Sequence, residues 1–246
     1  MNNVKINYSK HGGSPSGSLP NTGLGNRLFM YFYGVFRCVK GYNTKIVEES
    51  DLDDEGKMWT HPKKFATTFI EKFHGAKESD RNCDHIGFPH AYHQGKHDIK
   101  QLMNQRDMVV RDFGKESGTF VHVRLGDFLR PDLEHLIAPL DYYRKCLTGL
   151  PGGYIASDSP EHEIVQTLIS EFDLKVFVST AEKTMIFGSK FENKVLSRET
   201  FSWWIGFIGN QNNVLYPEPL WPQLGRLDKA QSSSQMFAMQ KNWSIC

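Results

Sequence analysis

Short apolar runs alternate with longer amphipathic stretches along the second half of this 246-residue chain. Apolar runs of about five residues predict buried strands, whereas apolar side chains spaced three or four positions apart predict helices. Strands that alternate with helices indicate a parallel sheet covered by helices, which is an α/β pattern. The predicted strands are residues 119–123, 153–157, 175–179, 193–197 and 213–217, and the predicted helices are residues 140–147, 161–172 and 199–209.

The first half of the chain has a weaker pattern of the same kind. Residues 4–8 and 44–47 are short apolar runs that predict strands. Residues 24–39 predict a helix that is buried on most sides, because apolar side chains fill nearly every position of its middle. The Gly-, Ser- and Pro-rich stretch at 10–23 predicts a loop. The polar, histidine-rich stretch at 48–97 predicts loops around one short helix at 65–73.

Composition and charge place the chain among ordinary globular proteins. Hydrophobic residues make up 39% and the formal net charge is +1, so bulk charge gives no reason to expect a nucleic-acid partner. No run approaches the ~20 apolar residues of a membrane span, and the first residues contain no apolar signal segment. The four cysteines lie far apart and predict reduced thiols. We therefore expect a cytoplasmic protein, bacterial or virus-encoded rather than resident in the Golgi lumen.

Polar and charged side chains follow the predicted strands directly. Arg124 and Asp127 come after the strand at 119–123, whereas Ser157 and Asp158 come at the end of the next strand. Ligands of parallel sheets bind at the carboxyl ends of the strands. We therefore expect a phosphate-bearing ligand between these strand ends and the neighbouring helix N-termini.

The segment before the long helix of the first half contains Gly23, Gly25, Asn26 and Arg27. Two glycines allow the backbone to approach a ligand closely, and the N–H groups at the start of the helix favour an anion. These features predict a donor-binding loop. A glycine-rich turn before a core helix, without any ligand, is the alternative that these residues leave open.

The strand at 119–123 runs into a motif in which His122, Arg124 and Asp127 are candidate catalytic residues. An arginine at the end of a buried strand is costly unless it is paired. The planar guanidinium of Arg124 suits a fork onto a diphosphate. A structural ion pair between Arg124 and Asp127 is the alternative.

Thr200, Phe201 and Ser202 lie in the first turn of the predicted helix at 199–209. Hydroxyl groups in a first turn either cap the helix or donate to a phosphate group. We expect these three residues to contact the donor. The alternative is a capped hydrophobic helix that binds no ligand.

These motifs occur in a defined order. The chain has TGLGNRLFMYFYG, HVRLGDF, a DYY helix, the pair Ser157 and Asp158, and TFSWWIGFIGN. This order resembles the α-1,2-fucosyltransferase family, which has GGLGNQLFQY-like, HxRRGDY, DYY, Ser-Asp-Asp and SFSWWGAWLN motifs. Leu125 takes the place of the second arginine of that pattern, and Arg27 takes the place of a glutamine.

The resemblance implies a GT-B-like α/β fold, with two Rossmann-like halves that face a central cleft. Residues 1–128 would form the N-terminal half on the acceptor side, with the GLGN loop. Residues 129–246 would form the C-terminal half that binds the nucleotide-sugar donor. A last helix, at 234–243, would return to the first half.

The resemblance also implies an inverting, metal-independent glycosyltransferase that needs no cofactor. It would move fucose from GDP-fucose to a hydroxyl of a glycan acceptor. Arg124 would stabilise the charge that develops on the diphosphate. Asp158 would hold the base or the ribose, and Asp127 and His122 are the candidates for the general base.

The polar middle segment contains two candidate metal-binding groups. Asp51, Asp53 and Asp54 offer oxygen ligands and would suit a Mn²⁺-dependent transferase of another fold. Imidazole clusters bind zinc, although the histidine spacing here matches no standard site and favours a solvated loop. The histidines concerned are His85, His90, His93 and His97.

Two further alternatives concern activity rather than fold. Fucose follows from the resemblance alone, so a transferase of another GDP- or UDP-linked sugar remains open. The replacement of a donor-site arginine by Leu125 also leaves open a catalytically inactive module that binds a glycan or a nucleotide.

Overall fold

The computed structural model describes residues 4–7, 24–25, 28, 44–47, 84–86, 113–209, 212–217 and 243–246. The chain divides into two compact units, Met1–Arg111 and Asp112–Cys246. This division lies earlier in the chain than the predicted boundary at residue 128. The strand that carries His122 therefore belongs to the second unit.

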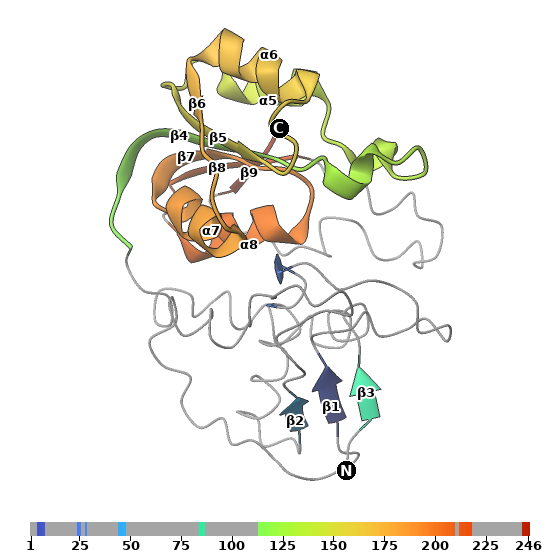
Figure 1. Cartoon of the computed structure of the whole chain (residues 1–246). Helices are drawn as coiled ribbons and strands as arrows, with labels where there is room; N and C mark the ends of the chain where they lie inside the picture. Colours follow the sequence, from blue (N-terminus) through green and yellow to red (C-terminus); the bar gives the residue numbers. More distant parts are fainter. Residues whose placement is uncertain are drawn as a thin grey trace. The chain divides into compact units, whose positions relative to one another are not determined.

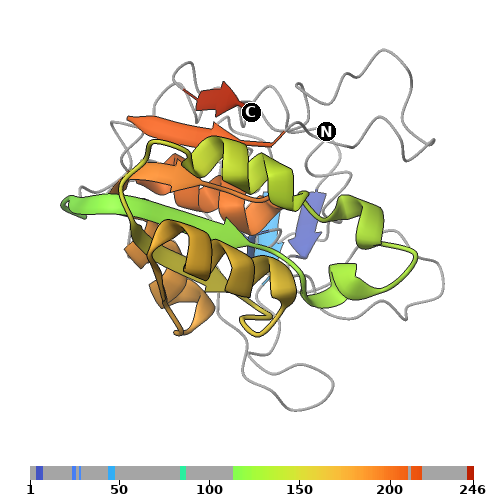
Figure 2. The ribbon, with the colours of Figure 1, turned by 90° about the horizontal axis from the view of Figure 1, so that it is seen from above.

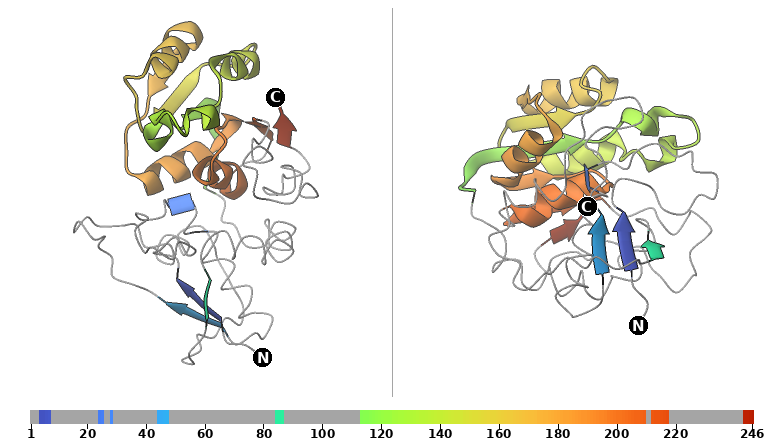
Figure 3. Two further views of the ribbon diagram at one scale, coloured as in Figure 1. Left: turned by 90° about the vertical axis from the view of Figure 1, so that its right-hand side faces the viewer. Right: turned by 60° about the horizontal axis from the view of Figure 1, so that its bottom comes forward.

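The first unit contains a parallel sheet of three short strands in the order β2-β1-β3 (Figure 3). β1 (Val4–Asn7) pairs with both β2 (Thr44–Val47) and β3 (Asp84–Ile86). Both strands predicted in the first half are confirmed. The prediction of a loop around residues 84–86 is wrong, because these residues form β3, which has a single apolar side chain and forms by pairing with β1.

The second unit is built on a six-stranded sheet whose paired strands are all parallel (Figure 1). The strand order is β6-β5-β4-β7-β8-β9, which reads 3-2-1-4-5-6 when β4 is counted first. Doubly wound nucleotide-binding sheets have this order, with a switch point between the first and fourth strands. The predicted parallel α/β architecture is confirmed for this unit. The strands are β4 (Glu116–Val123), β5 (Gly153–Ser157), β6 (Leu174–Val176), β7 (Phe191–Val195), β8 (Asn213–Tyr216) and β9 (Trp243–Ile245).

Helices cover both faces of this sheet (Figure 1 and Figure 2). α5 (Leu140–Leu147) and α6 (Glu163–Phe172) lie on one face, whereas α7 (Ala181–Ser189) and α8 (Thr200–Ile208) lie on the other. Each helix connects two parallel strands, as a doubly wound sheet requires. In the described part of the chain, no helix is long and apolar enough to cross a membrane.

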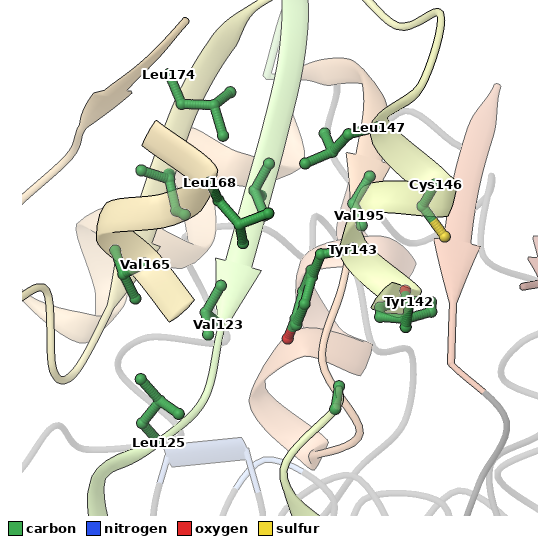
Figure 4. Close-up of a cluster of buried hydrophobic side chains, with 13 residues drawn as sticks. Val123, Leu125, Tyr142, Tyr143, Cys146, Leu147, Val165, Leu168, Leu174 and Val195 are labelled. Carbon is green, nitrogen blue, oxygen red and sulfur yellow. The ribbon is translucent and has the colours of Figure 1, made fainter. Parts of the chain in front are cut away.

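A hydrophobic cluster lies between the sheet and the helices α5 and α6 (Figure 4). Apolar side chains recur at helical spacing on both helices, so each helix turns one apolar stripe toward the sheet. The strands contribute continuous apolar runs because both of their faces are covered. The labelled members of the cluster are Val123, Leu125, Tyr142, Tyr143, Cys146, Leu147, Val165, Leu168, Leu174 and Val195.

The opposite face is closed by α8, which is buried along most of its length. Every residue from 202 to 208 is buried, and the ring of Trp203 stacks on that of Phe207 at 4.8 Å. At Gly206, a Cβ atom would come within 2.6 Å of Cζ2 of Trp243 from β9. This close approach explains why a glycine stands inside the helix.

Three elements of the second unit differ from the pattern-based predictions. The strand predicted at 175–179 is the shorter β6, which ends at Val176. The apolar pattern misses α7, because its buried positions include Thr184, Gly188 and Ser189 rather than an apolar stripe. The apolar pattern also misses β9, which begins at residue 243. The predicted helix at 234–243 otherwise lies outside the described residues.

Candidate functional site

Arg124 lies at the carboxyl edge of the sheet, directly after β4. Its Nη1 group donates to the carboxylate of Asp158 and its Nη2 group to that of Asp127. The guanidinium carbon lies 5.6 Å from the ring centroid of Phe128. The side chain of Arg124 is 35% exposed, so the cation is held in one orientation and still reaches solvent.

Strand pairing brings Asp158 to Arg124. Val123, the last residue of β4, is in register with Ser157, the last residue of β5, so the two following residues meet at the edge of the sheet. The Oδ1 atom of Asp158 accepts a hydrogen bond of 2.9 Å from the backbone N–H of Leu125. One carboxylate thereby fixes both the side chain of Arg124 and the loop that follows it.

Gly126 allows this ion pair to form. Its φ of +32° lies in the left-handed region that favours glycine. A Cβ atom at this position would overlap Oδ2 of Asp158 and would lie 3.0 Å from its Cγ atom and 3.3 Å from Nη1 of Arg124. The glycine of the Arg-x-Gly-Asp motif therefore leaves room for the aspartate of the neighbouring strand end. Asp127 lies in the first turn of the short helix η1 (Gly126–Leu129).

The hydroxyl of Ser197 joins the ends of β4 and β7 across the switch point. It accepts a hydrogen bond of 2.8 Å from the backbone N–H of Arg124 and donates to the carbonyl of His122 at 3.1 Å. The hydroxyl of Tyr143 lies 3.2 Å from the same Oγ atom. Burial raises the pKa of Tyr143 well above its ordinary value, so this hydroxyl stays protonated as a donor.

His122 lies in a buried polar group behind Arg124. Its Nδ1 atom is 2.7 Å from Oγ of Ser202 and 3.2 Å from Oε1 of Glu199. The ring also packs on Phe201, with centroids 5.1 Å apart. The side chains of His122 and Glu199 are only 8% and 13% exposed. An imidazole and a carboxylate are therefore paired away from solvent.

Glu199 is the N-cap of α8. Its carboxylate accepts hydrogen bonds from the backbone N–H groups of Phe201 and Ser202, at 2.9 and 3.1 Å from the latter. Burial raises the pKa of Glu199, but contact with His122, the bond from Ser202 and the charge of Arg124 outweigh it and lower the pKa below its ordinary value. The protein's own carboxylate thus occupies the anion position at this helix N-terminus.

The charge of Arg124 is permanent. Burial alone would lower its pKa, but the carboxylates of Asp158, Glu199 and Asp127 raise the pKa above its ordinary value. Three carboxylates therefore surround one guanidinium. An anionic ligand that approaches Arg124 competes with these carboxylates, and Asp127 can leave at the lowest cost because its side chain is 55% exposed.

The predicted residues at the ends of β4 and β5 form one cluster. Arg124, Asp127 and Asp158 are in direct contact, so the structural ion pair considered from the sequence is present and is extended by Asp158. Ser157 has a local role, since its Oγ atom accepts a hydrogen bond of 3.1 Å from the backbone N–H of Ser159. It shapes the turn that carries Asp158.

The start of α8 contains the predicted donor-contacting residues Thr200, Phe201 and Ser202. Ser202 is fully buried, and its Oγ atom also accepts a hydrogen bond of 3.1 Å from the backbone N–H of Ser197. Ser202 contacts His122 from inside the fold, and the half-buried Phe201 packs on its ring. Thr200, the first helical residue, is half-buried.

The predicted sites of the first half lie almost entirely outside the described residues. Gly25 is described as a buried helical residue of the first unit, and His85 lies in β3. In the described ranges, no three His, Cys, Asp or Glu side chains are grouped as a metal ion requires. The candidates outside the described residues are Gly23, Asn26, Arg27, Asp51, Asp53, Asp54, His90, His93 and His97.

Three residues of this site have no assigned role in the sequence-based prediction. Glu199 carries a recognisable signal, because a polar residue directly before an apolar helix is a candidate N-cap. Ser197 and Tyr143 carry no such signal in the sequence, since their contact joins segments 54 positions apart in the chain. Only the packing of α5 against the sheet reveals them.

Comparison of the chain with protein-family models, with curated proteins and with solved structures finds no match. Any functional conclusion therefore depends on the motifs and on the geometry of the second unit. The decisive geometric feature is the cluster of Arg124, Asp127 and Asp158 beside the switch point of the sheet.

Proposed function

We propose that this chain is an inverting, metal-independent glycosyltransferase that moves fucose from GDP-fucose to a hydroxyl of a glycan acceptor. The observation that carries the proposal is the partly exposed guanidinium of Arg124 at the switch point of a doubly wound sheet. Nucleotides bind at this point of such sheets, and a guanidinium fork matches the oxygens of a diphosphate. Fucose and the GT-B-like arrangement of two halves rest on the resemblance of the motifs.

In this proposal Arg124 binds the diphosphate of the donor. Negative charge grows on the phosphate group as the bond to the sugar breaks, and a positioned cation stabilises that charge. Asp158 keeps the guanidinium oriented and is itself held by the backbone N–H of Leu125. The phosphate replaces Asp127 as the acceptor of the hydrogen bond from the Nη2 group of Arg124. Exchange of one anion for another leaves the charge of the cation balanced.

The acceptor hydroxyl must lose its proton during the transfer. Asp127 and His122 are the two predicted bases, and their exposures differ greatly, at 55% and 8% of the side chain. Once released from Arg124, Asp127 is the accessible carboxylate at this edge. We assign the proton transfer to Asp127 and assign His122 to the buried support of the strand end.

A second function is favoured by the charge of the site. Leu125 stands where the resembling family has a second arginine, and it is fully buried in the hydrophobic cluster under α5 and α6. One guanidinium thus faces the carboxylates of Asp127, Asp158 and Glu199. A module that binds a nucleotide or a glycan without turnover needs less charge stabilisation than a transferase does.

Calorimetric titration of the full chain with GDP, UDP and GDP-fucose in the presence of EDTA tests the proposal. GDP and GDP-fucose are expected to bind without metal. Arg124→Ala is expected to lower the affinity for GDP by about 30- to 100-fold, because a charge-assisted contact is lost. Transfer or hydrolysis of GDP-fucose, measured as GDP release, then separates an enzyme from a binding module.

Arg144→Ala is the matched control. Arg144 also forks onto a carboxylate, that of Glu171, at 2.8 and 2.6 Å, but it lies on α5 away from the strand ends. This variant is expected to bind GDP like the wild type. Tight binding of UDP instead of GDP would contradict the donor assignment, and equal binding by Arg124→Ala and wild type would contradict the site.

A further inference from the structure

Cys146 and Cys246 are far apart in the sequence and approach the same end of β8. Cys146 lies on the inward face of α5, one turn after Tyr142. The hydroxyl of Tyr142 donates to the carbonyls of Leu196 and Leu215, at 2.8 and 3.1 Å. The backbone N–H of Cys246 donates to the carbonyl of the next residue, Tyr216, at 3.2 Å. α5 and the end of β9 are thus brought together over β8.

The two thiols are neighbours in the core of the second unit. Cys246 packs against the hydrophobic cluster that contains Cys146, and both cysteines are free. Burial raises the pKa of Cys146, and the proximity of Cys246 raises it further. Cys146 is 4% exposed, whereas Cys246 is half-buried. An oxidant from solution therefore reaches Cys246 first.

We propose that Cys146 and Cys246 form an intramolecular disulfide when the protein meets a small-molecule disulfide such as oxidised glutathione. The thiolate of Cys246 attacks one sulfur of that molecule, and one glutathione thiolate leaves. The thiolate of Cys146 then attacks the Cys246 sulfur of the mixed disulfide, and the second glutathione leaves. The two cysteines lose two protons and two electrons, and the oxidised glutathione becomes two reduced molecules.

The disulfide fastens β9 to α5. β9 is an edge strand of three residues that pairs with β8 in the sheet, and such short pairings are weak by themselves. Its residue Trp243 packs against Gly206 of α8, the helix capped by Glu199. A covalent link that closes a long loop restricts the unfolded chain and so stabilises the folded unit. Oxidation therefore strengthens the attachment of the strand that covers α8.

Mass spectrometry of the full chain tests this thiol pair directly. Trypsin releases residues 146–175 and 242–246 as separate peptides, each with one cysteine. After incubation with oxidised glutathione at pH 8 and alkylation of remaining thiols, these peptides are expected to appear as one linked species that reductant separates. The thermal midpoint of the oxidised protein is expected to rise by roughly 5–10 °C.

Cys246→Ser leaves the buried Cys146 in place and is expected to lose both the linked species and the redox-dependent midpoint. The double variant Cys38→Ser/Cys83→Ser is expected to keep both, because neither residue belongs to the pair. A link to Cys38 or Cys83 would overturn the proposal. So would stable glutathionylation of Cys246 without any linked peptide, since Cys146 would then be out of reach of Cys246.

Discussion

Glu199→Gln is expected to lower the free energy of unfolding of the second unit by about 2–3 kcal/mol at pH 7. The carboxylate accepts hydrogen bonds from the backbone N–H groups of Phe201 and Ser202 and lies 3.2 Å from Nδ1 of His122. Glutamine keeps the shape but offers one acceptor oxygen and no charge, so α8 loses its charged cap. Denaturant unfolding, followed by the fluorescence of the buried tryptophans of α8, measures this loss.

The same substitution is expected to change how stability depends on pH. The pKa of Glu199 is lower in the folded protein than the ordinary 4.5 of an unfolded chain. The unfolded state therefore binds the proton more readily, and the stabilisation by this carboxylate is fully present above pH 4.5. It is lost as the pH falls through the lower folded pKa. The part of the difference between wild type and Glu199→Gln that comes from this carboxylate should shrink as the pH falls below 4.5.

Glu171→Gln is the matched control for this prediction. Glu171 also pairs with a cation, Arg144, but both side chains lie on the exposed surface of the helices, at 38% and 42% exposure. Solvent screens such a pair, so its removal should leave the unfolding curve nearly unchanged at pH 7. Equal stability of Glu199→Gln and wild type at pH 7 would contradict the role of Glu199 as a buried cap.

Gly126→Ala is expected to destabilise the second unit by about 2–3 kcal/mol and to weaken nucleotide binding. About 1 kcal/mol of this comes from a left-handed backbone that alanine adopts at a cost. The remainder arises because the new Cβ would overlap Oδ2 of Asp158, so that carboxylate must leave Arg124 and the N–H of Leu125. Denaturant unfolding and calorimetry with GDP measure the two effects.

Gly149→Ala isolates the backbone contribution. Gly149 also has a positive φ, +82°, but a Cβ atom there meets nothing within 4 Å. This control is expected to cost only about 1 kcal/mol and to leave nucleotide binding unchanged. In an Asp158→Ala background the cost of Gly126→Ala should fall toward that of Gly149→Ala, because the overlapping carboxylate is gone. Equal costs of the two glycine substitutions in the wild-type background would contradict the steric role of Asp158.

The parallel architecture of the second unit follows from local patterns in the sequence. Strands buried on both faces have continuous apolar runs, and α8 is apolar on every side, so both kinds of element are recognised from short segments. β3 and β9 are not recognised, because each has three residues and depends on pairing with a neighbouring strand. α7 is missed because small and polar residues fill its buried positions.

The chain order also predicts which residues gather at the candidate site. Arg124, Asp127 and Asp158 follow strand ends, and all strand ends of a parallel sheet share one edge whatever the strand order. The sequence therefore determined the α/β class of the second unit, its main strands and the charged residues of its carboxyl edge. These properties depend on short-range patterns and on the direction of the strands alone.

Only the tertiary structure decided which groups meet and which face inward. Asp158 contacts Arg124 because β5 lies next to β4, and Ser202 meets His122, 80 positions away, because α8 packs beneath the switch point. The packing of α5 and α6 buries Leu125, and the packing of α8 makes Glu199 the anion at the N-terminus of that helix. Strand order and side-chain direction result from the packing of distant segments, which no local pattern contains.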